Sequence, residues 1–72
     1  MEQQLINIGN LAEGTRVHYA PKFGYRQNGI VKCRSSYEHA VFVVYKCNGD
    51  WKNFENYTAE LTDISDLKQG WI

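Results

Sequence analysis

The chain has 72 residues, enough for one small domain and too few for two separate hydrophobic cores. Its eight basic and eight acidic residues balance, which argues against a general polyanion binder with a strongly basic surface. Because the sequence contains neither a signal-peptide pattern nor an apolar run long enough to cross a bilayer, we expect a cytoplasmic protein that does not use a membrane.

The chain begins with a segment, residues 1–13, that predicts an N-terminal arm or a short helix. Its apolar residues are compatible with either, and Gly9 would end either element early. We expect the remaining residues, 14–72, to form a single β domain. The sequence pattern does not decide whether this arm packs on the β domain.

The first two strands are predicted on either side of a loop. Residues 15–20 alternate between polar and apolar side chains and end at Pro21, which has no amide hydrogen to offer a sheet. The loop over 22–27 carries aromatic and basic residues, and the Asn-Gly pair at 28–29 is typical of a tight turn. A second strand is predicted over 30–34.

The strongest predicted strand covers residues 40–46. Its β-branched and aromatic residues favour a pleated strand, and both of its faces are apolar. In so short a chain, both faces can be covered only if the sheet curls back on itself. The hairpin that joins it to the preceding strand is predicted to place Cys33 opposite Val41. Cys47 would then lie too far along the ladder for a disulfide, so both thiols are expected to be reduced.

The last third of the chain predicts two further strands and one short helical turn. Residues 51–57 are aromatic but not periodic, and predict a loop with at most one turn of helix. A fourth strand is predicted over 59–62. Residues 63–70 predict one helical turn that ends at a left-handed Gly70. Trp71-Ile72 would follow as a final strand or as a plug. Short strands separated by glycine turns indicate an all-β barrel rather than a βαβ unit.

Several stretches resemble SH3-like barrels of the KOW or Tudor kind. The sequences GTRVHY at 14–19, NGIV at 28–31 and VFVVY at 41–45 are similar to the first three strands of such a barrel. The DL pair before the GW pair at 70–71 is similar to the 3₁₀ turn that precedes its last strand. The stretch 14–72 also resembles small proteins of bacteria, their phages and mobile elements.

These resemblances imply a small five-stranded SH3-like barrel with one short 3₁₀ turn near the C-terminus. They also imply a location in the cytosol of a bacterium or of a phage host. They imply no catalytic residue and no cofactor, and small barrels of this kind serve many unrelated functions.

Two loops gather most of the candidate binding residues, and 14% of the chain is aromatic. The resemblance implies that the loop over 22–27 lies near the segment 51–57. We therefore expect one protein-binding face, because aromatic rings provide a large contact area at low entropic cost. Its predicted residues are Phe23, Tyr25, Arg26, Trp51 and Phe54. The alternative is that these side chains only close the ends of a very small barrel.

A group of basic residues predicts a possible anion-binding surface. Lys22, Lys32 and Arg34 occur, with Arg26, in a stretch without acidic residues. Residues two apart in a strand share a face, so Lys32 and Arg34 are expected to lie side by side. Together with Tyr25 they would suit single-stranded nucleic acid or a nucleotide. The alternative is a solvated strand face that protects a sheet edge.

Catalytic and metal-binding patterns do not emerge from the sequence. The two histidines and two cysteines lack the close pairing of zinc ligands, and no nucleophile has an evident base and orienting group. We therefore expect no metal, no cofactor and no enzyme activity.

The leading hypothesis is a protein-interaction module, an accessory protein of a phage or mobile element that binds another protein or itself. One alternative is a nucleic-acid-binding barrel. Another is an inhibitor of a bacterial defence system, which would block an effector or sequester a nucleotide within an oligomer.

Overall fold

A computed structural model describes residues 12–72, which form five antiparallel strands in one sheet and two short 3₁₀ segments. The strands are β1 (Arg16–Tyr19), β2 (Gln27–Arg34), β3 (Ala40–Val44), β4 (Glu60–Asp63) and β5 (Leu67–Gln69). The 3₁₀ segments are η2 (Trp51–Asn56) and η3 (Ile64–Asp66). The predicted all-β class is confirmed, while most of the predicted arm, residues 1–11, lies outside the described residues.

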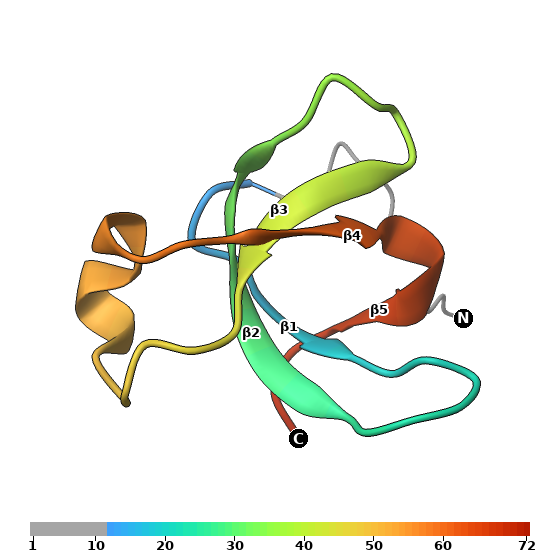
Figure 1. The fold of residues 1–72 in the computed structure, drawn as a ribbon, viewed down its shortest axis with the longest axis horizontal. Coiled ribbons are helices and arrows are strands. Elements are labelled where there is room, and N and C mark those ends of the chain that lie inside the picture. The colour runs from blue at the N-terminus through green and yellow to red at the C-terminus, as the bar shows by residue number, and fades with distance from the viewer. Residues whose placement is uncertain (1–11) are drawn as a thin grey trace.

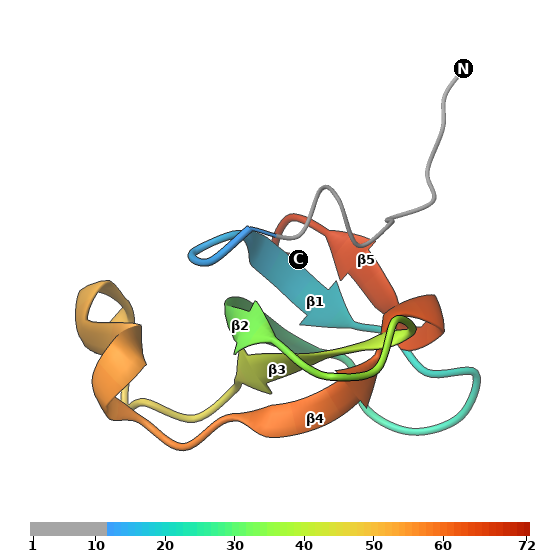
Figure 2. The same ribbon diagram turned by 90° about the horizontal axis from the view of Figure 1, so that it is seen from above.

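The sheet is strongly curved around its core. Its strand order is β4-β3-β2-β1-β5, and all neighbouring strands are antiparallel. Figures 1 and 2 show how the curvature brings the two edge strands to the same side, where η3 joins them directly. The main buried cluster consists of Val17, Val31, Val41, Val43, Tyr45 and Leu67.

The prediction that the central strand is shielded on both faces is confirmed. In β3, Val41, Val43 and Val44 are fully buried and Ala40 is 4% exposed. Only Phe42 keeps part of its surface in solvent. Neighbours of opposite orientation in this strand are therefore both covered: Val41 and Val43 belong to the core cluster, while Val44 is buried on the other face, where it pairs with Ile30.

The Asn-Gly pair at 28–29 is not the turn that its sequence predicts. Both residues lie within β2, where Gly29 pairs with Val17 and Asn28 pairs with His18. Gly29 is needed because the side chains of Val43 and Tyr45 approach its backbone closely. A glycine inside a strand often marks such an approach. The actual connection between β1 and β2 is the loop over 20–26.

The register of the central hairpin differs from the predicted one. Cys33 pairs with Phe42, not with Val41, because the register shifts between Val31 and Cys33. Such a bulge inserts one extra residue, here Lys32, into β2. Both cysteines are free, as expected; Cys33 is exposed and Cys47 is buried.

The C-terminal turn is shorter than predicted, and the last strand begins earlier. The Asp63 carboxylate accepts hydrogen bonds from the Ser65 amide (2.9 Å) and hydroxyl (2.8 Å), which caps η3. Gly70 is left-handed, with φ of 88°, and ends β5 rather than a helix. Trp71 then folds back onto the sheet, where its indole Nε1–H donates to the Gly29 carbonyl at 2.8 Å. Of the two alternatives for this segment, the final strand is wrong, because residues 71–72 form no strand.

Tyr45→Phe is expected to lower the free energy of unfolding by about 1 kcal/mol, the net value of a typical buried hydrogen bond. The Tyr45 hydroxyl lies 2.8 Å from the Thr62 hydroxyl, and this buried contact joins β4 to the residue that directly follows β3. Burial also raises the pKa of Tyr45, so its hydroxyl stays protonated. Urea denaturation measures the loss. Tyr25→Phe, at a ring that is 90% exposed, serves as the control and is expected to change nothing. Equal stability of both variants would contradict a contribution from this contact.

Candidate functional site

A shallow groove lies between β1, β2, η2 and the C-terminal residues. It has a volume of about 450 Å³. Its lining consists of Gly14, Arg16, Ile30, Trp51, Lys52, Phe54 and Trp71. No carboxylate occurs among these lining residues, so the groove combines apolar walls with positive charge.

The sheet supplies one wall of the groove. Arg16 begins β1 and pairs with Ile30 of β2. Alternation along β1 buries Val17 completely while Arg16 remains exposed. Ile30 is 6% exposed and forms an apolar floor beside the guanidinium group.

The 3₁₀ segment η2 supplies the other wall. None of its residues is fully buried, so core packing alone does not hold it in place. Instead, the Asp50 carboxylate accepts hydrogen bonds from the Asn53 amide (2.9 Å) and the Tyr57 hydroxyl (3.0 Å). The bulged Lys32 donates from Nζ to the Tyr57 carbonyl at 2.8 Å. These bonds fasten both ends of η2 and fix the rings that it carries.

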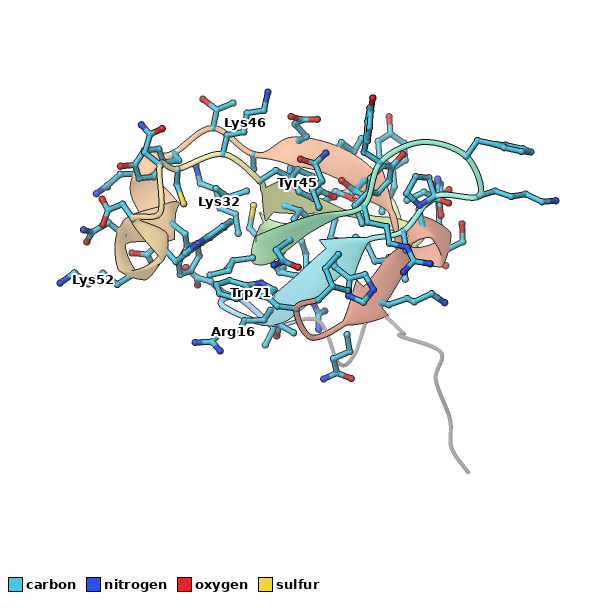
Figure 3. All side chains as sticks on the ribbon, turned by 90° about the horizontal axis from the view of Figure 1, so that it is seen from below. Arg16, Lys32, Tyr45, Lys46, Lys52 and Trp71 are labelled. Carbon is cyan, nitrogen blue, oxygen red and sulfur yellow. The ribbon has the colours of Figure 1, made fainter. Side chains whose placement is uncertain are left out.

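Two tryptophans meet in the groove. The ring centroids of Trp51 and Trp71 lie 4.9 Å apart, with an angle of 53° between the ring planes. The Arg16 guanidinium carbon lies 4.6 Å from the centroid of the Trp71 ring, in a cation–π contact. Figure 3 shows Arg16 beside Trp71, with Lys52 projecting from η2. Because Trp71 is also hydrogen-bonded to Gly29, it holds the guanidinium at a defined place.

Two carboxylates lie next to the groove in sequence. Glu13 precedes Gly14 and Glu55 follows Phe54. Hydrogen bonding with the Glu55 carboxyl, and then repulsion between the two charges, raise the pKa of Glu13 above its ordinary value. Glu13 therefore takes up a proton at a higher pH than an isolated glutamate does.

The structure does not bring the predicted binding residues together. Trp51 and Phe54 lie in the groove. Phe23, Tyr25 and Arg26 lie in the β1–β2 loop, where Phe23 and Tyr25 are 85% and 90% exposed. Figure 1 shows this loop and η2 at opposite ends of the molecule. The separation arises because the chain leaves β3 away from the loop before it forms η2. The predicted single face is therefore two separate surfaces.

The predicted anion-binding residues are also dispersed. Lys22 lies in the β1–β2 loop, Lys32 is turned toward η2 by the bulge, and Arg34 ends β2. Lys32 and Arg34 therefore do not form the regular pair expected from their spacing. Instead, the cations that line the groove together with aromatic residues are Arg16 and Lys52, which sequence reasoning missed.

Comparisons of the chain with protein-family models, with curated proteins and with solved structures found no match in any of the three. In the described part of the chain, no helix is long and apolar enough to cross a membrane. The groove itself is therefore the basis on which a function can be inferred.

Proposed function

We propose that this protein is a non-enzymatic protein-interaction module that binds an acidic and partly apolar segment of another protein in the groove. The observation that carries this proposal is the presence of three aromatic rings and two cations, without a carboxylate, in one groove lining. We further assign the fold to the SH3-like barrels, supported by the curled five-stranded sheet and the 3₁₀ segment before β5. A role as an accessory protein of a phage or mobile element rests on the sequence resemblance alone.

The groove suits a segment in which a carboxylate neighbours an apolar side chain. The apolar side chain would pack against Ile30 and Trp51, since aromatic walls give a large contact area with few rotamers to fix. The carboxylate would reach Arg16, whose planar fork matches a carboxylate with two parallel hydrogen bonds. Lys52 adds a second, more adaptable charge. Because Trp71 already holds the guanidinium in place, the Arg16 side chain loses little conformational entropy when a partner binds.

A protein partner is favoured over nucleic acid for an electrostatic reason. The chain has no net charge, and its other basic residues do not line the groove. Tight binding of a nucleic acid relies on several simultaneous phosphate contacts, which two groove cations do not provide. A nucleotide or short single strand, stacked on Trp51, is the competing occupant that the experiment has to distinguish.

The test is the selection of peptides from a random display library on the immobilised protein. We expect enrichment of sequences with Asp or Glu next to aromatic, aliphatic or proline residues. Both tryptophans of the chain line the groove, so their emission reports its occupancy without a label. The Arg16→Ala/Lys52→Ala variant is expected to bind a selected peptide with at least about tenfold lower affinity, because charge-assisted hydrogen bonds are lost. Lys68→Ala, at an exposed cation of β5, is the matched control.

Two outcomes would overturn the proposal. One is the selection of basic peptides, or of peptides that bind the double variant as tightly as the unchanged protein. The other is a response to a thymidine oligonucleotide or to ATP at lower concentrations than to any selected peptide, which would favour the nucleic-acid alternative.

A further inference from the structure

The β1–β2 loop presents the most exposed aromatic side chains of the described residues. Phe23 is 85% exposed and Tyr25 is 90% exposed, and both project from residues 20–26. Lys22 and Arg26 flank them in sequence. Isolated apolar residues at a surface need no explanation, but two large exposed rings and two exposed cations within residues 22–26 make this loop an amphipathic surface. Such a surface suggests an occupant that offers carboxylates and apolar contact together.

An acidic cleft lies directly beside this loop. It has a volume of about 260 Å³. Its lining includes Tyr19, Gln27, Glu60, Leu61, Asp63 and Asp66. Tyr19 ends β1 and Gln27 begins β2, so the two residues that bracket the loop also line the cleft. In addition, the Ala20 amide donates to the Asp66 carbonyl at 2.8 Å, which ties the start of the loop to η3. The loop and the cleft are thus parts of one surface.

The cleft is suited to an organic cation with an apolar neighbour. Tyr19 and Tyr45 contact edge to face, with ring centroids 6.0 Å apart, and form an aromatic side to the cleft. Leu61 is 47% exposed at its edge. The bonds from Ser65 lower the pKa of Asp63, which keeps this carboxylate charged. In residues 12–72 no set of three acidic, histidine or cysteine side chains is grouped to hold a metal ion, so an ammonium or guanidinium group is the better match.

We propose that two copies of this chain pair through reciprocal insertion of the β1–β2 loop into the acidic cleft. Lys22 and Arg26 of one copy would face Glu60 and Asp63 of the other, and the loop aromatics would cover Leu61. In a two-fold symmetric dimer both copies use the same surface, so that surface must contain both the inserted loop and the cleft that receives it. The adjoining loop and cleft meet this requirement. Because the chain has no net charge, overall electrostatic repulsion does not keep two copies apart.

Pairing through this surface leaves the groove of each copy accessible. The β1–β2 loop and η2 lie at opposite ends of the molecule (Figures 1 and 2). A pair would therefore present two separate grooves and bind a repeated partner with higher avidity than one copy. The pairing itself does not depend on what the groove binds.

The test is sedimentation velocity of the full chain over a wide range of concentrations, at low and at high salt. We expect a monomer–dimer equilibrium that salt weakens, because charges near the surface are screened. Lys22→Glu/Arg26→Glu is expected to raise the dimer dissociation constant by at least about tenfold, since like charges would then face each other. Lys68→Glu and Trp51→Ala are the controls and are expected to leave it unchanged.

A mixing experiment separates pairing through this surface from any other association. Glu60→Lys weakens the cleft of its own copy, and Lys22→Glu/Arg26→Glu reverses the loop of its own copy. Mixed together, each reversed loop faces a cleft with an added lysine, while each unchanged loop faces an unchanged cleft. Heterodimers are therefore expected to form more tightly than either variant pairs with itself. A chain that stays monomeric at all concentrations, or variants that mix without recovery, would overturn the proposal.

Discussion

Gly29→Ala is expected to lower the free energy of unfolding by roughly 2 to 3 kcal/mol, in the upper part of the range for overpacked cores. A Cβ atom at this position would lie 2.6 Å from Cγ1 of Val43 and 3.0 Å from two ring atoms of Tyr45. Both side chains are buried, at 0% and 9% exposure, so neither can turn into solvent to make room. The strand itself would have to move. For a domain of this size each kcal/mol corresponds to about 4–8 °C of melting temperature.

Urea denaturation followed by circular dichroism measures this effect, and two further variants test its cause. Gly49 is left-handed, with φ of 80°, and no atom lies within 4 Å of the place that a Cβ would take, so Gly49→Asn is expected to cost less than about 1 kcal/mol. In Gly29→Ala/Val43→Ala the removed methyl groups make room for the new one. The loss of unfolding free energy in the double variant should be smaller, by about 1 kcal/mol, than the sum of the losses in the two single variants. A Gly29→Ala protein as stable as the original would show that close packing does not explain this glycine.

The strands were predictable where a local pattern and the fold agree. Residues 40–44 are β-branched and apolar on both faces, and only a covered strand satisfies that pattern, so β3 appears close to its predicted position. The pair at 28–29 shows the opposite case. Its turn signal is local, whereas the reason for Gly29 is the approach of Val43 and Tyr45 from another strand. Only the three-dimensional packing shows that contact.

The candidate site was predictable only in part, for a similar reason. Trp51 and Phe54 were expected to bind because they are aromatic residues outside a periodic element. Arg16, Lys52 and Trp71 come from three separate segments, and each alone has an ordinary explanation as a strand-face cation, a surface lysine or a plug. Their meeting depends on the path of the chain after β3 and on the return of the C-terminus to Gly29. Neither is encoded in a short motif.

Substitutions of the two tryptophans are expected to affect peptide affinity and stability differently. Trp51 belongs to a segment without fully buried residues, so Trp51→Ala should change the free energy of unfolding by less than about 1 kcal/mol. Its half-buried ring lines the groove, however, and loss of an aromatic contact residue commonly costs about 2 kcal/mol or more in affinity. We therefore expect at least about tenfold weaker binding of an acidic peptide selected on the unchanged protein.

Trp71→Ala, by contrast, is expected to reduce both stability and binding. It removes the indole that donates to the Gly29 carbonyl at 2.8 Å and the ring on which Arg16 rests. The lost hydrogen bond and packing together should cost roughly 2 to 3 kcal/mol of unfolding free energy. Trp71→Phe retains a ring beneath Arg16 but cannot donate, so it should lose about 1 kcal/mol and keep most of the affinity. Calorimetric titration with the same peptide and urea denaturation of all three variants provide the comparison. If Trp51→Ala binds the peptide as the original protein does, the groove is not the site where that peptide binds.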